Sequence, residues 1–320
     1  MKNNINLSYI LTTYNKINYL KEVLPYLLDN CQEDEEIVVV DGGSNDETPQ
    51  YIENLYKQGK IHQFISEKDS GEAEGFNKAI LMAKGELVKV ITDDDLYDYQ
   101  NIQICKQFML KNKEIDVIIG NIASVYLTEN KDKLSIILMQ QYQKWFEEWI
   151  NKETKNCFFC GLSLLIRKKS FSFLGLLDSS FKYTDLEFSI RITTKQANIA
   201  FYKPLLVCSV VNQNSSSVNS RDVFEFERNK VVGFYDYKIP ISLIQKNQKT
   251  PSIFQRIWNK ILRTIGIKKP EILIPNLNPT YAEFNHFEKI SDLYPYLHHF
   301  LEKYNQENTI EKDDLFILRK

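Results

Sequence analysis

The sequence predicts an α/β fold built around a mostly parallel sheet. Over about the first 120 residues, short apolar runs suited to strands alternate with segments whose apolar residues recur at helical spacing. One run, Ile37–Val40, is β-branched and has no polar face, which is typical of a parallel strand covered by helices on both sides. Because strands and helices alternate at these spacings, the chain is expected to form consecutive βαβ units.

The predicted elements follow one another in a regular order. Four apolar runs are predicted to be strands: Leu7–Leu11, Ile37–Val40, Ile61–Ile65 and Leu87–Ile91. Three segments between them are predicted to be helices: Tyr19–Leu28, Pro49–Tyr56 and Phe76–Ala83. Ligands of parallel sheets bind beyond the carboxyl ends of the strands. Polar segments follow all four strands and are expected to meet at that edge: Thr12–Asn15, Asp41–Ser44, Glu67–Asp69 and Asp93–Asp95.

Three consecutive aspartates, Asp93, Asp94 and Asp95, are the most informative of these polar groups. Carboxylates this close repel one another, so each needs a counter-charge or solvent. A solvated acidic turn would satisfy them, and so would a divalent cation such as Mg²⁺ or Mn²⁺, which prefers oxygen ligands. The sequence contains neither of the usual glycine-rich phosphate loops. A metal held by the aspartates is therefore the expected way to neutralise a bound diphosphate.

Composition limits the class of protein. The chain has 320 residues and a net charge of −2, which argues against a nucleic-acid-binding surface spread over the whole chain. No apolar run reaches the length of about 18 residues that a membrane span needs, and no apolar segment follows Met1–Asn4 as in a signal peptide. Cys157 and Cys160 form a C-x-x-C pair, but no second pair completes a zinc site. We therefore expect a cytoplasmic protein with reduced thiols.

Several segments resemble the family 2 glycosyltransferases, which have the GT-A fold and use nucleotide-sugar donors. The matching segments keep the order and spacing of that family: Tyr9–Asn15, Ile37–Thr48, Asn77–Glu86 and Asp93–Asp95. A second block, from Cys160 to Arg191, resembles the acceptor half of the family, and the resemblance ends near Val218. It implies a GT-A α/β core with a nucleotide-sugar-binding half over 1–120 and an acceptor-binding half over 121–222. A helical C-terminal extension is expected over 223–320.

The resemblance also implies roles for individual residues of the donor half. Thr12 and Tyr14 fall where the family contacts the nucleotide base and ribose, and Asp41 falls where it hydrogen-bonds the base. Asp69 and Asn77 flank the loop and helix that border the donor diphosphate and sugar, although Asn77 could equally be an ordinary residue on a helix surface.

The position of the metal ligand is open, because Thr92 occupies the first acidic position of the D-x-D-D pattern common in the family. The resemblance implies that Asp94 or Asp95 binds Mn²⁺ or Mg²⁺, with Asp94 favoured. Asp93 is then expected to lie nearer the ribose.

In the acceptor half, Asp185 is the expected catalytic base. Direct displacement at a sugar needs a carboxylate that takes the proton of the acceptor hydroxyl. Asp185 also precedes a segment with apolar residues at helical spacing, so the alternative is a helix N-cap. Glu187 is the nearest rival base, but it faces elsewhere on a helix. Arg191 would either orient a phosphate or pair with an acid.

Two later segments each leave two interpretations open. Asn212–Ser220 has almost no apolar content and would be an exposed linker or a lid over the donor. From Tyr237 to Pro270 there is no acidic residue, and a helical stripe of apolar residues there includes Trp258. This basic amphipathic helix would either lie on an anionic membrane surface or pack its apolar face on the catalytic domain.

Two other functions compete with sugar transfer. One is a non-catalytic nucleotide-sugar-binding protein of the same fold, against which the joint presence of the aspartate run and Asp185 argues. The other is a nucleic-acid-binding protein that uses the basic Tyr237–Pro270 stretch, but the chain lacks an aromatic and basic sheet motif. We therefore expect a nucleoside-diphosphate sugar donor, a glycan or lipid-linked glycan acceptor, and no nucleic-acid partner. The resemblance implies a role in surface polysaccharide biosynthesis, in the cytoplasm or peripherally on the inner face of the membrane.

Overall fold

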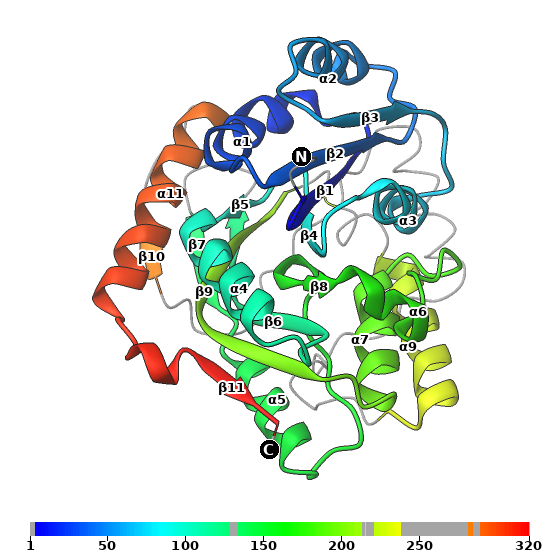
Figure 1. Ribbon diagram of the computed structural model, residues 1–320, viewed down its shortest axis with the longest axis vertical. Coiled ribbons are helices and arrows are strands. Elements are labelled where there is room, and N and C mark those ends of the chain that lie inside the picture. The colour runs from blue at the N-terminus through cyan, green and yellow to red at the C-terminus, as the bar shows by residue number, and fades with distance from the viewer. Residues whose placement is uncertain are drawn as a thin grey trace.

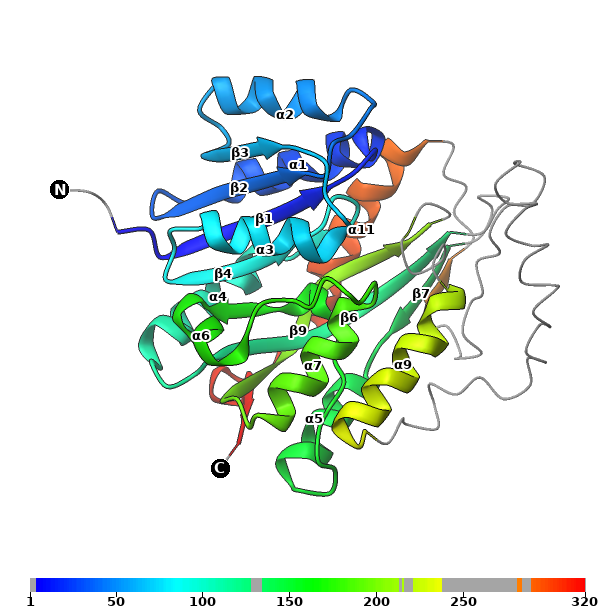
Figure 2. The same ribbon diagram turned by 90° about the vertical axis from the view of Figure 1, so that its right-hand side faces the viewer.

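The computed structural model describes residues 4–127, 134–212, 215, 221–237, 281–283 and 289–319. These residues form a single sheet flanked by helices (Figures 1 and 2). Its main path has the strand order β10-β7-β6-β8-β4-β1-β2-β3, and β9 lies beside β6. The predicted α/β class, with a mostly parallel nucleotide-binding half, is confirmed.

The N-terminal half follows the predicted alternation of strands and helices. Its elements are β1 (Leu7–Thr13), α1 (Ile17–Asn30), β2 (Glu35–Asp41), α2 (Thr48–Lys57), β3 (Gln63–Ser66), α3 (Glu72–Met82) and β4 (Leu87–Ile91). Strand β1 runs parallel to β2 on one side and to β4 on the other, and β3 is parallel to β2. Every residue of β2 is buried, as its apolar sequence predicts for a strand covered on both faces.

Helix α3 begins four residues before the predicted start at Phe76. Its first turn contains Glu72 and Glu74, which carry no apolar periodicity and therefore gave no helical signal. Both acids lie at the N-terminus of the helix, where the backbone N–H groups and the helix dipole favour negative charge. The preceding Gly71 has a φ of +136°, a conformation that L side chains rarely adopt.

The second half of the sheet is mixed. Its helices and strands are β5 (Leu96–Tyr97), α4 (Tyr99–Lys111), β6 (Val117–Leu127), β7 (Leu134–Leu138), α5 (Gln141–Ile150), β8 (Leu165–Arg167), α6 (Phe171–Leu174), α7 (Thr184–Thr194) and β9 (Ile199–Val211). Strand β8 pairs antiparallel with both β4 and β6, whereas β9 runs parallel to β6. The expected boundary between the nucleotide-sugar-binding half and the acceptor-binding half, at residue 120, falls inside β6. This strand therefore contributes to both halves.

The described part of the C-terminal region is helical, as predicted, and also contains two strands. Helices α9 (Arg221–Tyr235) and α11 (Ile290–Glu307) confirm the helical character of this region. Strands β10 (Tyr281–Glu283) and β11 (Phe316–Leu318) pair antiparallel with β7 and β9 and extend the sheet. Three-residue strands are too short to produce a recognisable alternation, so the sequence did not predict them. Helix α11 packs with residues of α1 and β9 in one apolar cluster (Figure 1).

Two segments that carried open interpretations are largely outside the described residues. Of Asn212–Ser220 the structure describes only Asn212 and Ser215, and of the basic segment Tyr237–Pro270 it describes only Tyr237. The lid and the membrane-facing helix therefore stay predictions. Within the part of the chain that is described, no helix is both long enough and apolar enough to cross a lipid bilayer.

Candidate active site

The polar segments after β1 and β2 are tied to each other at the carboxyl edge of the sheet. The backbone N–H of Asn15 donates to Ser44 Oγ at 2.8 Å, and the backbone N–H of Asn45 donates to Asn15 Oδ1 at 2.8 Å. Asn15 has a φ of +53°, which Asn tolerates better than most residues. The two predicted segments thus form one surface, from which the side chain of Tyr14 extends into solvent.

Asp41 organises the loop that follows β2. It is fully buried, and its carboxylate accepts hydrogen bonds from the backbone N–H groups of Gly43 and Ser44 at 3.2 and 3.1 Å. The hydroxyls of Ser44 and Ser66 also donate to it, the latter at 2.5 Å. Both carboxylate oxygens are therefore used within the protein. Its expected contact with the nucleotide base stays a prediction.

Asp69 and Thr12 pack closely around two glycines. A Cβ atom on Gly42 would lie 3.0 Å from Asp69 Oδ1, and one on Gly75 would lie 2.9 Å from Thr12 Cγ2 and 3.2 Å from Asp69 Oδ2. These distances are shorter than ordinary contacts, so a side chain at either position would require Asp69 or Thr12 to shift. The structure therefore brings Thr12 and Asp69, two of the predicted donor-binding residues, to the same place at the start of α3.

The aspartate run is buried and is compensated by a lysine that the sequence analysis did not single out. Lys16, just before α1, forms an ion pair with Asp94 and lies 3.6 Å from Asp93 Oδ1. Burial alone would lower the pKa of Lys16, but these carboxylates outweigh burial and raise the pKa above its usual value. One ammonium group thus provides positive charge for two carboxylates.

The three aspartates differ in how their oxygens are used. Asp95 Oδ1 accepts from the backbone N–H of Val210 at 2.7 Å, and Asp95 Oδ2 accepts from Thr92 Oγ1 at 2.6 Å. The contacts of Asp94 are both at Oδ2, from Lys16 and from Asn212 Nδ2. Among the described residues, Asp94 Oδ1 accepts no hydrogen bond. A metal could therefore bind Asp94 through an oxygen that accepts no hydrogen bond from a described residue, whereas both oxygens of Asp95 already accept one.

Burial makes this run unfavourable for negative charge. It raises the pKa of Asp93 to about 6, although Lys16 opposes the shift, and it raises the pKa of Asp95 with a further contribution from the neighbouring Asp94. Carboxylates of this kind gain from a nearby cation, so the chemistry of the site fits Mg²⁺ or Mn²⁺. In the described part of the chain, however, no group of three or more acidic, cysteine or histidine side chains is arranged to hold a metal.

Asp185 lies in the first turn of α7 and is not the N-cap. The helix begins at Thr184 and its N-cap is Tyr183, which makes no side-chain capping bond. The simple capping role considered for Asp185 is therefore wrong. A Cβ atom on Gly161 would lie 3.1 Å from Asp185 Cβ, so the turn at Gly161–Ser163 packs directly on this residue. Burial raises the pKa of Asp185 to about 6, while the backbone amides of Gly161 and Leu186 oppose that shift.

Glu72, at the start of α3, connects Asp185 with the aspartate run. Crowding of its carboxylate by protein atoms, followed by the negative charges of Asp185, Asp93 and Asp94, raises the pKa of Glu72, although the residue as a whole is exposed. The backbone supports the same grouping, because the turn at Gly161 that packs on Asp185 continues to Leu164, which accepts from the N–H of Val90 at 3.3 Å just before the aspartate run. The sequence analysis missed Glu72, and its position in a helical turn without apolar periodicity gave no signal.

Asn77 and Arg191 hold one short segment from two sides. Asn77 Nδ2 donates to the carbonyl of Leu177 at 2.8 Å, and Asn77 Oδ1 accepts from the N–H of Leu177 at 2.9 Å. Arg191 donates to the carbonyls of Leu174 and Leu176, the latter at 2.7 Å. We call residues 174–177 the braced segment. It joins α3, where Glu72 lies, to α7, where Asp185 lies.

Arg191 also forms an ion pair with an acid, which is the second of its two expected roles. Its Nε lies 2.8 Å from Glu187 Oε1, and Tyr235 donates to the same oxygen at 2.8 Å. Glu187 is almost fully buried, and both of its carboxylate oxygens accept hydrogen bonds from Arg191, so this rival base is held within the protein. The expected contacts of Asn77 and Arg191 with substrate stay predictions.

Several contacts at the site come from residues far along the chain. Asn212 reaches Asp94 from the end of β9, and the Tyr294 hydroxyl in α11 donates to the backbone carbonyl of Asp94 at 2.6 Å. No local pattern connects Tyr294 with a residue 200 positions away. Lys16 could have been found from its sequence position, because it directly follows a polar turn expected at the same edge as the aspartates.

The fold resembles those of solved glycosyltransferase structures. A complex of S. aureus TarS 1–349 with UDP-GlcNAc matches with a TM-score of 0.52 and 18% identity, over 73% of this chain and 68% of that one. The mannosyltransferase PcManGT from Pyrobaculum calidifontis, in complex with GDP-Man and Mn²⁺, matches with a TM-score of 0.50 and 15% identity, over 79% of this chain and 67% of that one. At such identities the likeness establishes the fold alone.

Sequence comparison identifies the family. An uncharacterized glycosyltransferase of Rickettsia typhi is 30% identical over 182 residues, which are 55% of this chain and 55% of the relative. The chain spans about half the length, or less, of the curated relatives it matches first. The model of the family described as Glycosyl transferase family 2 matches residues 8–175, slightly more than half of the chain. The chain therefore belongs to glycosyl transferase family 2.

Proposed function

We propose that this protein transfers a sugar from a nucleoside-diphosphate sugar to a hydroxyl group of a glycan or lipid-linked glycan acceptor. The observation that carries the proposal is the convergence of Asp185 with the aspartate run. The turn at Gly161 packs on Asp185. Leu164, at the end of that turn, accepts a hydrogen bond at 3.3 Å from the N–H of Val90, which lies in β4 just before the aspartate run of this family 2 chain. A base for the acceptor and charged groups for the donor are thus available in one place.

Asp185 is proposed to act as the general base of an inverting displacement. The acceptor oxygen forms a bond to the anomeric carbon while the bond from that carbon to the diphosphate oxygen breaks. The diphosphate leaves with the electron pair of the broken bond, and Asp185 accepts the hydroxyl proton. With its pKa raised to about 6, the carboxylate is mostly deprotonated at neutral pH and is a stronger base than an ordinary aspartate.

The donor is proposed to bind along the surface formed by the loops after β1, β2 and β3. Thr12 and Tyr14 would contact the nucleotide, Asp41 would shape the loop that meets the base, and Asp69 would border the diphosphate. Support comes from the glycines at 42 and 75, which keep this surface free of side chains where Asp69 and Thr12 meet. Asp93, which shares the charge of Lys16, would lie nearer the ribose.

Asp94 is proposed to hold Mn²⁺ or Mg²⁺ together with oxygens of the donor diphosphate. A bound divalent cation would supply positive charge to the leaving diphosphate. Among the described residues, Oδ1 of Asp94 accepts no hydrogen bond, which favours Asp94 over Asp95 as the metal ligand. The Mn²⁺ and GDP-Man in the PcManGT complex also support this proposal for a chain of similar fold.

Nucleotide titrations test the donor and metal parts of the proposal. UDP, GDP and dTDP are titrated by calorimetry into the parent protein and into Asp94→Asn, with Mn²⁺ or with EDTA. We expect one nucleotide to bind, its affinity to fall with EDTA, and Asp94→Asn to remove most of the Mn²⁺ dependence. Equal affinity with and without the metal would contradict the metal proposal while leaving donor binding intact.

Turnover measurements test the base. Asp185→Asn should retain the parent's nucleotide affinity but lower the turnover of the matching nucleotide sugar by roughly 10²- to 10⁴-fold, the usual contribution of a positioned base. Asp178→Asn, at an exposed aspartate seven residues earlier, is the matched control and should behave like the parent. Near-normal turnover in Asp185→Asn would assign the proton transfer to another group.

A further inference from the structure

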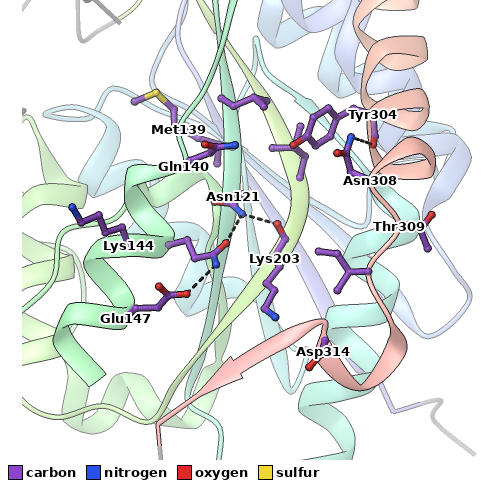
Figure 3. Close-up of a pocket in the computed structure, with 15 residues that line it drawn as sticks. Asn121, Met139, Gln140, Lys144, Glu147, Lys203, Tyr304, Asn308, Thr309 and Asp314 are labelled. Atoms are coloured by element: carbon purple, nitrogen blue, oxygen red, sulfur yellow. Dashed lines mark hydrogen bonds between the residues drawn. The ribbon is translucent and has the colours of Figure 1, made fainter. Parts of the chain in front are cut away.

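A polar trough lies on the sheet (Figure 3), and none of its lining residues belongs to the candidate active site. Its volume is about 670 Å³, within the range of about 300–1,000 Å³ typical of ligand sites. Strands β6 and β9 form its floor, α5 forms one wall, and the end of α11 with the following residues forms the other. The trough is defined by Asn121, Gln143, Glu147, Lys203, Tyr304 and Asn308, together with their neighbours.

A row of linked polar side chains crosses one wall and the floor. Gln143 Nε2 donates to Glu147 Oε1 at 2.9 Å, and Asn121 Nδ2 lies 3.4 Å from Gln143 Oε1. Asn121 Nδ2 also donates to the backbone carbonyl of Lys203 at 2.6 Å. These contacts fix the orientation of two amide groups and one carboxylate, so a ligand would meet preorganised donors and acceptors.

The floor contains a local irregularity at Asn121. The pairing of β6 with β9 shifts register on both sides of this residue, and such bulges often redirect a side chain beside a binding site. Among the described residues, the buried Oδ1 of Asn121 accepts no hydrogen bond. The irregularity places the amide of Asn121 on the floor of the trough, beside Gln143.

The charges of the trough favour a neutral ligand. Lys144 and Lys203 are balanced by Glu147 and Asp314, so the site has no excess charge that would select a phosphate or nucleotide. Most of its remaining polar groups are amides and hydroxyls, which both donate and accept hydrogen bonds. Apolar side chains line the same space: Ile122, Leu138, Met139, Leu205 and Ile310. A sugar ring has the matching chemistry, because its hydroxyl groups can pair with the amides and its C–H groups can pack on the apolar side chains.

We propose that the trough is a second, non-catalytic site that binds a segment of a neutral oligosaccharide. Lys203 precedes Val210 by seven residues in β9, and Val210 is the residue that contacts Asp95. Because β9 bulges here, residues 202 and 210 pair with Gly120 and Val125 of β6, which are five residues apart and so about 17 Å from each other at 3.3–3.4 Å per residue. A glycan held in the trough therefore leaves the carboxyl edge of the sheet accessible. The proposal concerns binding alone, so it does not depend on the proposed transfer reaction.

Saturation-transfer NMR with three neutral probes, maltotriose, chitotriose and mannotriose, tests the site. UDP and Mn²⁺ are present in excess to occupy the candidate active site, and inorganic phosphate serves as the charged comparison. We expect at least one trisaccharide to bind the full-length protein under these conditions, and to bind Asp185→Asn equally well. Binding of none of the three, or loss of binding on adding UDP, would overturn the proposal, as would displacement of the sugar by phosphate.

Matched variants locate the binding. Gln143→Leu and Asn308→Ala remove polar groups from opposite walls, and each should weaken the trisaccharide about tenfold. Gln141→Leu makes the same replacement on the same helix at a residue that does not line the trough, and should keep the parent's affinity. Circular dichroism and thermal unfolding establish that all variants are folded. Parent-like binding by both trough variants, or equal loss in Gln141→Leu, would overturn the assignment.

Discussion

Two buried ion pairs at the candidate active site use their charges in opposite ways. Arg191 pairs with one acid, Glu187, and also donates to the carbonyls of the braced segment, residues 174–177. Lys16 instead lies between two acids, Asp93 and Asp94, and leaves Asp94 Oδ1 without a hydrogen bond among the described residues. In the Arg191 pair one positive charge meets one negative charge. In the Lys16 group one positive charge faces two negative charges.

This difference separates residues that build the site from residues that are available to a ligand. In a pair whose charges and hydrogen bonds are all used within the protein, a ligand would add nothing. The role of such a pair is to hold the surrounding backbone in place. A group of carboxylates with too little positive charge gains from any cation that arrives. By this criterion Arg191 helps to position α7. Asn77, whose amide nitrogen and oxygen are both hydrogen-bonded to Leu177, does the same for α3. Asp94, in contrast, is open to a metal.

The largest expected effect is on folding and comes from the Arg191 pair. Arg191→Met leaves Glu187 buried without its partner and frees two carbonyls, so the free energy of unfolding should fall by about 3–5 kcal/mol. Urea denaturation measures it. Lys195→Met, an exposed lysine after the same helix that donates to the carbonyl of Phe173, is the control and should cost less than about 1 kcal/mol. Similar losses of unfolding free energy in both variants would mean that Arg191 has no special role in holding residues 174–177.

The other side of the braced segment should have a smaller effect. Asn77→Ala removes both hydrogen bonds to Leu177, so we expect a loss of about 1–3 kcal/mol in the free energy of unfolding. Because α3 and α7 are then less firmly joined, turnover should fall more than nucleotide affinity. Calorimetry and initial rates on the same preparation separate the two. A loss of nucleotide affinity with unchanged stability would instead support direct contact between Asn77 and the donor.

The pH dependence should report Asp185. A base must be deprotonated, so kcat/KM should fall about tenfold per pH unit below an apparent pKa near 6, the value to which burial raises this carboxyl. In the folded protein the raised pKa means that stability is lost as pH rises from the unfolded value toward 6. Asp185→Asn lacks this loss, so its thermal midpoint relative to the parent should increase between pH 4 and pH 6 and then level off. A constant difference over that range would argue against a buried ionised carboxylate.

The smallest expected effect concerns the Lys16 group. Lys16→Met removes the cation that pairs with Asp93 and Asp94 among the described residues, so Mn²⁺ should raise the thermal midpoint of this variant more than that of the parent. We expect an extra increase of about 2–4 °C, equivalent to about 1 kcal/mol. Lys21→Met, at an exposed pair with Glu47, provides the control and should respond as the parent does. An unchanged response in Lys16→Met would mean that the lysine does not limit cation binding.

Local sequence was sufficient for the donor half of the fold. The four strands and three helices were predictable because each is a continuous apolar run or a periodic segment, and the polar residues after them reach one edge by topology alone. Strands β10 and β11 were not predictable, because each consists of three residues that become a strand only by pairing with β7 or β9.

The site was predictable to the extent that its groups lie at strand ends. Asp93, Asp94 and Asp95 were identified, but their unequal roles depend on Val210, Asn212 and Lys16, which come from three different parts of the chain. Arg191 and Asn77 were singled out by resemblance to the family. Their contacts with residues 174–177 depend on tertiary packing, which no spacing in the sequence encodes.

The contacts of the aspartate run also set an order of events during biosynthesis. Asp95 is satisfied by Val210, 115 residues later, and the carbonyl of Asp94 is satisfied by Tyr294, 200 residues later. At roughly 5–20 residues per second, a ribosome needs on the order of 10–40 s to make the chain between Asp94 and Tyr294. During that interval Asp95 lacks the N–H of Val210 or the Asp94 carbonyl lacks the hydroxyl of Tyr294. Expressed alone, residues 1–120 would lack both partners, so the half that carries the donor residues is not a self-sufficient module.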